Sequence, residues 1–335
     1  MIPYSVLDLA VVTEGSNPKE AIELSRELAV YAEELGYNRF WMAEHHNMEH
    51  IASSATSVLL GHMAEATTKI RIGSGGIMLP NHSPYIVAEH FGTLATMYPQ
   101  RIDLGLGRAP GTDQTTAHAI RPNRMQEVYN FPDNVALLQN YLSKENTDKV
   151  RAFPGEGTEV PIWILGSSTD SAHLAAKLGL PYAFASHFAP QQLMDGIRIY
   201  RDNFQPSKQL EKPYVMAGIN VIAADTNEQA EYLSTSTKQM FVGVISGERN
   251  PLPPPVDDIN DVLPFQHQMA LKQMLAYSFV GDKEQISKQL TDFLSKTKVD
   301  EVITASYIFD HQERLKSHRF FSEVMAEINE TSPKA

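Results

Sequence analysis

The chain has 335 residues, of which 42% are hydrophobic and 20% are charged, and this composition excludes disordered and collagen-like proteins. Its 28 basic and 40 acidic residues give a net charge of −12, which disfavours binding to nucleic acid or to an anionic membrane. The lack of cysteine excludes disulfides and thiolate sites, and with no signal peptide or run of 18 apolar residues we expect a cytoplasmic protein.

Short apolar runs alternate along the chain with longer segments of helical spacing. The runs are continuously apolar, as expected of strands buried on both faces, and the helical segments begin at signals such as Asn17-Pro18 and Ser83-Pro84. Eight strands are predicted, at residues 6–12, 38–43, 70–75, 102–106, 162–165, 182–185, 214–223 and 301–306. Because a helical pattern follows each strand, we predict one (β/α)8 TIM barrel domain over residues 1–335.

Several connections between these elements carry local predictions. Ser53-Ser54 are expected to cap the second helix, and residues 109–123 are expected to form a polar loop. Pro132 lies inside the next helical pattern and is expected to kink or divide that helix.

The segment at about 246–265 follows the helix after the seventh strand and is rich in proline and aspartate. Regular secondary structure is not expected there, because the segment contains Pro251, Pro253, Pro254 and Pro255. We therefore expect an inserted loop. A long loop beside the mouth of a barrel is usually functional, and we predict a mobile lid. The alternative is a fixed insertion packed on the neighbouring helix.

Polar residues follow three neighbouring strands of the predicted barrel. The second strand ends at Glu44-His45-His46, the third at Gly73-Ser74-Gly75-Gly76 and the fourth at Gly107-Arg108. In parallel α/β folds ligands bind where the carboxyl ends of the strands meet, so these residues are expected to share one site.

Each of these groups has a functional and a structural interpretation. The histidines could bind metal, but neighbouring residues of a strand point to opposite faces, so we favour a catalytic or cofactor-contacting role for His45 and expect no metal. Glycines in a core strand indicate a bulge, a tight corner or a flat ligand against backbone. Arg108 suits a phosphate, with a surface ion pair as the alternative. Gly107-Arg108 does not match a dinucleotide fingerprint.

The fifth strand is followed by Gly166-Ser167-Ser168-Thr169-Asp170-Ser171, which leads directly into a helix. Hydroxyl groups and free backbone N–H groups at the start of a helix favour a phosphate. Plain helix capping by Ser168 or Asp170 would give the same sequence pattern, and both interpretations stay open.

Four segments spread over most of the chain carry a family resemblance. They are residues 41–46 (WMAEHH), 73–82 (GSGGIMLPNH), 103–108 (DLGLGR) and 163–168 (WILGSS). With these segments the sequence resembles the bacterial luciferase-like monooxygenases, flavin-dependent (β/α)8 barrel enzymes, and in particular their single-chain members of unassigned substrate.

The resemblance implies a site for reduced FMN and a set of residue roles. It implies a non-proline cis peptide between Gly75 and Gly76 behind the flavin ring, phosphate binding by Arg108, Ser168 and Ser171, and catalysis by His45. It also implies a lid after the seventh strand and a homodimer. Since no dinucleotide fingerprint is present, we expect a separate flavin reductase to supply reduced FMN.

Bacterial luciferase itself differs from this chain around the implied flavin site. It has Ala-Ala at the cis bond, a cysteine near the flavin and an acidic residue before the phosphate-binding serine, where this chain has Gly75-Gly76, Gly107 and Ser167. Light emission and a long-chain aldehyde substrate are therefore not implied. The function expected is a flavin monooxygenase acting on a small organic molecule. Two alternatives are a hydride-transferring enzyme that uses a deazaflavin and a catalytically silent flavin-binding protein.

Overall fold

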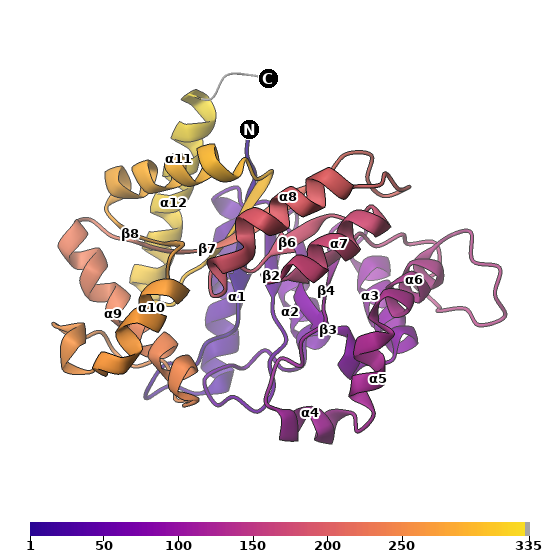
Figure 1. Ribbon diagram of the computed structural model, residues 1–335, viewed down its shortest axis with the longest axis horizontal. Coiled ribbons are helices and arrows are strands. Elements are labelled where there is room, and N and C mark those ends of the chain that lie inside the picture. The colour runs from indigo at the N-terminus through magenta and orange to yellow at the C-terminus, as the bar shows by residue number, and fades with distance from the viewer. Residues whose placement is uncertain (332–335) are drawn as a thin grey trace.

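Eight parallel strands pair in a closed ring in the computed structural model, which describes residues 1–331 (Figure 1). The ring runs β1-β2-β3-β4-β5-β6-β7-β9, and β9 pairs with β1 to close it. This confirms the predicted (β/α)8 barrel. The strands are β1 Tyr4–Asp8, β2 Arg39–Met42, β3 Arg71–Met78, β4 Ile102–Gly107, β5 Ile162–Gly166, β6 Tyr182–Phe184, β7 Val215–Ala223 and β9 Glu301–Ala305.

Helices follow the strands, and the longer ones pack against the outside of the ring (Figure 1). They are α1 Pro18–Glu34, α2 Thr56–Ala66, α3 Pro84–Met97, α4 Gln114–Ile120, α5 Arg124–Tyr129, α6 Phe131–Leu142, α7 Thr169–Leu178, α8 Leu193–Asn203, α9 Asn227–Ser246, α10 Gln268–Met274, α11 Lys283–Thr297 and α12 His311–Thr331. Asn17 caps α1 by accepting a hydrogen bond from the Glu20 N–H at 3.1 Å. Pro132 lies in the first turn of α6 and separates it from α5, as predicted. None of the described helices is long and apolar enough to span a bilayer.

The apolar core has two main layers, one between the strands and the helices and one inside the barrel. Phe40, Phe91 and Phe321 belong to the outer layer, whereas Trp41 and Trp163 belong to the inner one. The alternation of strand side chains produces both layers, because neighbouring residues point to opposite faces. Both faces of each strand are therefore buried, which explains the continuous apolar runs in the sequence.

A ninth strand, β8 (Ser278–Gly281), was not predicted from the sequence. It pairs with Asn220 to Ala223 at the end of β7. The Tyr214 carbonyl points toward β6 and the Asn220 N–H toward β8, so the two strands use the same edge of β7. Since β6 has only three residues, β8 occupies the edge that β6 leaves free.

Three local predictions were wrong. The first strand ends at Asp8 rather than Val12, because Ala10 has a positive φ of 48° and turns the chain away. Ser53 does not cap α2; its hydroxyl donates to the Ala43 carbonyl at 2.5 Å, and Ala55 holds the N-cap position. Residues 109–123 are not all loop, because Asp113 caps α4 by accepting a hydrogen bond from the Thr116 N–H at 2.9 Å.

The proline-rich segment 246–265 has more structure than its composition predicted. Leu252 forms a β-bridge with Thr13, and its N–H donates to the Val12 carbonyl at 2.9 Å. The Val256 N–H donates to the Thr235 hydroxyl on α9 at 2.8 Å. Two short 3-10 helices follow, η3 (Ile259–Asp261) and η4 (Phe265–His267), and no residue in either is buried. The first half of the segment is therefore attached to the barrel, while the second half is exposed.

Candidate functional site

The segments that follow the carboxyl ends of β2 and β3 are joined through one buried carboxylate, Glu44. It accepts hydrogen bonds from His46 Nε2 at 2.7 Å, His82 Nε2 at 2.9 Å, Asn81 Nδ2 at 3.2 Å and the Met78 N–H at 2.9 Å. Burial alone would raise the pKa of Glu44, but the hydrogen bonds from His46 and His82 outweigh it and lower the pKa to about 2. Glu44 is therefore an ionised anchor that fixes the loops at the mouth of the barrel.

Two imidazoles reach the mouth from opposite sides of the barrel. His45 follows β2 and His187 follows β6, and β3, β4 and β5 separate the two strands on one side while β1, β9 and β7 separate them on the other. Burial is the main cause that lowers the pKa of His45 to about 4, although the Gly111 carbonyl partly offsets it. Burial and the nearby His45 likewise lower the pKa of His187 to about 4. Both rings are therefore neutral at physiological pH.

Both imidazoles have a buried Nδ1 atom without a hydrogen-bond partner in the described part of the chain. Unpaired buried polar atoms are uncommon in folded proteins and call for a specific explanation, such as a ligand or water. His46 is different, because its Nε2 is bound to Glu44. Since β2 ends at Met42, strand alternation does not apply to His45 and His46, and it is their partners that distinguish them. Among residues 1–331, no three His, Asp or Glu side chains are arranged to hold a metal ion.

The glycines of β3 lie on the inner wall beside His45. The peptide bond between Gly75 and Gly76 is cis, as the resemblance implied, and the pairing of β3 with β4 shifts register there. A Cβ on Gly75 would lie 2.6 Å from the Leu7 side chain, and one on Gly76 would lie 2.6 Å from the Gly105 carbonyl oxygen. Packing within the barrel therefore requires both glycines.

Arg108, at the end of β4, reaches the start of α7 after β5. Its Nη2 lies 3.1 Å from Asp170 Oδ2, and both side chains are well exposed, by 47% and 70%. The backbone of Arg108 is fixed from the other side, because Arg124 Nη2 donates to the Arg108 carbonyl at 2.7 Å. The structure thus brings together the guanidinium and the helix start that the sequence indicated.

Ser168 and Ser171 differ in how their hydroxyls are engaged. Ser168 holds the N-cap position of α7, but its side chain makes no capping bond. The Ser171 hydroxyl donates to the Ser168 carbonyl at 2.7 Å and lies 3.1 Å from the Tyr182 hydroxyl. Capping by the Ser168 side chain is therefore not observed, and this hydroxyl is the freer of the two to meet a ligand.

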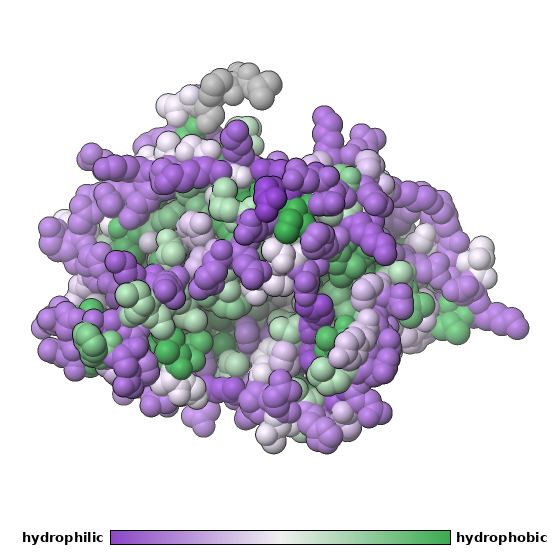
Figure 2. Space-filling model, viewed as in Figure 1, coloured by the Kyte–Doolittle hydropathy of each residue, from purple (hydrophilic) through white to green (hydrophobic). Residues whose placement is uncertain are grey.

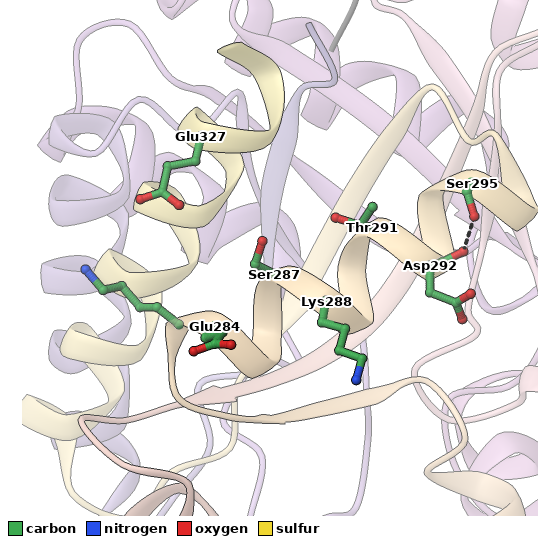
Figure 3. Close-up of a pocket in the computed structure, with 8 residues that line it drawn as sticks. Glu284, Ser287, Lys288, Thr291, Asp292, Ser295 and Glu327 are labelled. Atoms are coloured by element: carbon green, nitrogen blue, oxygen red, sulfur yellow. Dashed lines mark hydrogen bonds between the residues drawn. The ribbon is translucent and has the colours of Figure 1, made fainter. Parts of the chain in front are cut away.

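The loops that frame this end of the barrel carry α4, α5 and α10, which lie along the lower side of Figure 1. In the lower centre of Figure 2, apolar surface recedes between the polar side chains of these flanking segments. A second hollow lies elsewhere, in a surface groove between α11 and α12 (Figure 3). Glu284, Lys288 and Asp292 are among the residues that line that groove, and none of the predicted site residues does.

The sequence analysis missed two residues at the mouth. Glu44 was given no role of its own, whereas its carboxylate joins the segments after β2 and β3. His187 was not considered at all, although it directly follows the predicted sixth strand in the segment Ala185-Ser186-His187. The position of His187 after a predicted strand was a usable signal, because the same criterion had already singled out His45 and Arg108.

Comparison with known proteins identifies several relatives of the chain. The family described as luciferase-like monooxygenase matches residues 2–301. A protein of Escherichia coli (strain K12) named luciferase-like monooxygenase is 50% identical over 328 residues, which are 98% of each chain. A Bacillus subtilis (strain 168) protein named N-acetyl-S-alkylcysteine monooxygenase is 32% identical, covering 97% of this chain and 98% of its own.

Solved structures show the same architecture. The crystal structure of apo-MsnO8 has a TM-score of 0.91 at 32% identity and covers all of both chains. At 14% identity, the oxygenating constituent of a 3,6-diketocamphane monooxygenase of Pseudomonas putida in complex with FMN has a TM-score of 0.71 over 96% of this chain and 97% of its own. An F420-dependent secondary alcohol dehydrogenase is 18% identical and has a TM-score of 0.68, covering 98% of this chain and 99% of its own. The last two show the fold alone.

Proposed function

Because this chain belongs to the luciferase-like monooxygenase family, we propose that it is an FMN-dependent monooxygenase that uses reduced FMN and oxygen to oxidise a small organic substrate. The proposed position of the cofactor phosphate rests on one observation. Arg108 extends from β4 to the first turn of α7, where it meets Asp170. A guanidinium beside a helix N-terminus suits a phosphate dianion.

The residues at the mouth fit a flavin phosphate and a flat ring. Arg108, Ser168 and the start of α7 would hold the phosphate, with Ser171 supporting the turn through its bond to the Ser168 carbonyl. The glycine wall at Gly75 and Gly76 would face the ring, because bare backbone lets a flat group approach closely. Bound there, reduced FMN would supply the electrons that reduce oxygen.

His45 is proposed as the catalytic residue. Its neutral form can accept a proton through the Nδ1 atom, which no group in residues 1–331 occupies. Glu44, its neighbour in sequence, fixes the surrounding loops and so holds the position of the imidazole. The exposed half of the 246–265 segment would act as the lid that excludes water.

Two other functions remain testable alternatives. A deazaflavin-dependent hydride-transfer enzyme has the same fold, as the F420-dependent dehydrogenase illustrates. A silent flavin-binding protein would consume oxygen without oxidising any candidate substrate. The absorption spectrum of the cofactor that copurifies with the protein separates FMN from a deazaflavin. The relative named N-acetyl-S-alkylcysteine monooxygenase supports oxygen chemistry, and its named substrate gives a first thioether to test.

We further propose that a separate flavin reductase supplies reduced FMN, that the protein acts as a homodimer, and that it functions in the cytoplasm. Rapid NADH oxidation by the purified protein with FMN alone would contradict the first of these. Sedimentation at micromolar concentration tests the second.

Calorimetric titration with FMN tests the proposed site. Arg108→Ala should weaken binding by about 1.5 to 3 kcal/mol, nearer the lower value because the side chain is half exposed. Arg198→Ala is the matched control, since Arg198 forms a similar exposed ion pair with Asp195 on α8. Equal FMN affinity in the two variants would exclude Arg108 from the phosphate site.

A further inference from the structure

A group of partly exposed apolar side chains lies above the carboxyl end of the barrel. The group packs against the inner cluster, which continues from Leu7 and Trp41 inside the barrel to Leu252 and Leu271 in the loops outside it. No member is fully buried, so each keeps surface that a small molecule can reach. We call this group the vestibule, and its members are Val11, Ile51, Met240, Ile245, Leu263 and Met274.

Backbone contacts hold the segments that carry the vestibule together. Val11 and Ile51 form an antiparallel β-bridge between the segments after β1 and β2. The Leu252 carbonyl accepts from the Glu14 N–H at 2.8 Å, which attaches the segment after α9 to the segment after β1. Figure 2 shows apolar surface that recedes at this end of the barrel, between polar side chains.

The second half of α9 is fixed to the segment that follows β9. The Thr237 hydroxyl donates to the Tyr307 carbonyl at 2.6 Å, and the Phe241 ring packs against the Tyr307 ring with centroids 6.4 Å apart. Ile245 lies one turn beyond Phe241 and therefore shares its face of the helix. The neighbouring Val244 is 52% exposed and does not belong to the inner cluster.

The short helix α10 has the same division between an apolar face and an exposed face. Leu271 and Met274 are three residues apart and both pack with the inner cluster. Lys272 and Gln273 lie between them in sequence and are exposed. The lysine of α10 is therefore turned away from the vestibule.

The positive charges around the mouth already have partners within the described residues. Burial lowers the pKa of His45 and of His187 to about 4, so both imidazoles are neutral at physiological pH. Three arginines pair with carboxylates at 3.1 Å and a fourth is buried against an amide, as Arg108–Asp170, Arg121–Glu127, Arg249–Asp113 and Arg124–Asn81.

The segments around the vestibule carry acidic side chains instead. The exposed ones are Glu49, Glu248, Asp257, Asp258 and Asp261. A carboxylate or sulfonate placed in the vestibule would lose hydration without gaining a cation, and the acidic side chains nearby would repel it.

We propose that the vestibule binds the alkyl or thioether part of an uncharged substrate, and that it rejects anionic molecules of the same shape. Four of its six side chains are aliphatic and two are methionines, whose flexible thioethers adapt to apolar groups of different shape. The inference deepens the proposed function by naming a substrate class. It rests on that function only in taking the bound molecule to be the substrate.

Two matched probes test the vestibule in the full chain without flavin. 3-(Butylthio)propanoate and its N-methylamide share the butyl thioether, but only the first is charged. We expect the amide to bind about 10-fold more tightly or more, because the carboxylate finds no cation. Each methylene added to the alkyl chain of the amide should raise affinity about three- to fourfold.

Binding is measured by NMR titration of protein labelled with ¹³C at the methionine methyl groups. The resonances of Met240 and Met274 should shift with the amide. Met97 is the control, because it is 59% exposed on α3, outside the vestibule, and its resonance should not shift.

Ile245→Lys places an ammonium group in the vestibule and should make the acid bind at least as tightly as the amide. Val244→Lys is the matched control, since it adds the same charge on the exposed face of α9 and should keep the preference for the amide. If Ile245→Lys does not fold, Met274→Lys carries the test, with Gln273→Lys as its control and Met240 as the reporter.

The assignment is overturned by any of three results. They are equal affinity of the wild type for acid and amide, shifts of Met97 as large as those of Met240, and an unchanged preference in the variant with lysine in the vestibule. Failure of the proposed function is distinguished from these, because it would appear as absent FMN binding in the calorimetric titration, whereas the probes are tested without flavin.

Discussion

The two ends of the barrel both contain buried polar side chains, but they differ in how completely those side chains are paired within the described chain. At the amino end, Arg39 joins Asp103 at 2.6 Å and Glu301 at 3.1 Å. Arg71 Nε donates to Asp103 Oδ1 at 3.0 Å, and the Tyr214 hydroxyl donates to Glu301 Oε2 at 2.9 Å. Each carboxylate there has partners on both of its oxygens.

At the carboxyl end, His45, His187, Asn220 and Ser306 each keep a buried polar atom without a partner in the described chain. The same strands form both ends of the barrel, and polar side chains are buried at each end. At the amino end these pairs join different strands, whereas at the carboxyl end fully paired groups such as Glu44 lie near unpaired ones. A variant at the amino end should therefore change stability alone, whereas one at the carboxyl end can change stability or binding.

The largest effect is expected from Asp103→Asn at the amino end. The change removes the charge that pairs with Arg39 and Arg71, and breaking a buried ion pair on one side costs about 3 to 5 kcal/mol of unfolding free energy. Urea unfolding measures the loss. Asp292→Asn is the control, because Asp292 pairs with Lys296 on the exposed face of α11 and should cost under about 1 kcal/mol. FMN affinity should not change in either variant, and a selective loss of FMN binding in Asp103→Asn would contradict the division between the ends.

Glu44→Gln should give the next largest effect and a pH dependence. The pKa of Glu44 is about 2 in the folded protein against 4.5 for the free group, so the unfolded chain binds the proton first as the pH falls. The carboxylate thus contributes on the order of 3 kcal/mol above pH 4.5, and this stability is lost between pH 4.5 and 2. In Glu44→Gln the unfolding free energy should be lower at pH 7 and should fall less steeply below pH 4.5. An acid dependence equal to that of the wild type would mean that Glu44 is not the ionised anchor.

Asp170→Asn should tighten FMN binding. Asp170 pairs with Arg108 and places a negative charge where a phosphate dianion is proposed to bind. Its removal should raise affinity by about two- to fivefold, the range of an exposed ion pair, and the gain should shrink at high salt. Asp195→Asn, which removes the exposed partner of Arg198, should leave affinity unchanged. Weaker binding in Asp170→Asn would show that Asp170 supports the phosphate site instead of competing for it.

The smallest effect concerns the attachment of the 246–265 segment to the mouth. Arg249 Nη1 lies 3.1 Å from Asp113 Oδ2 and 3.1 Å from the Asn47 carbonyl oxygen. Arg249→Ala should release the first half of the segment, so a glutamyl endopeptidase should cleave after the exposed Glu248 about threefold faster or more, without a change in FMN affinity. Arg319→Ala on α12 is the control for loss of an exposed arginine.

Limited digestion with chymotrypsin tests the lid in the wild type. Phe265 is 87% exposed in the second half of the segment, and chymotrypsin should cleave there in the free protein. Bound FMN should slow that cleavage if the segment closes over the mouth. Equal rates with and without FMN would mean that the segment is a fixed part of the wall.

Sequence alone determined the barrel and the edge on which the site lies. Continuously apolar runs followed by helical spacing specify strands buried on both faces, and polar residues after those runs must gather at one end. His45 and Arg108 were found in this way. The cis bond at Gly75 and Gly76 was found through the family resemblance, and Pro132 through its backbone chemistry.

Tertiary structure alone decided which polar groups are satisfied. Asp103 and Glu44 are both carboxylates near strand ends, and no local pattern shows that one lies beside two arginines while the other joins the segments after β2 and β3. The position of the His187 ring depends on the space left at Gly218, which is distant in sequence, and β8 depends on the edge that β6 leaves free. Hydrogen-bond satisfaction is a property of contacts between distant segments, so the sequence could locate the candidate site but could not divide its polar residues into supports and ligand contacts.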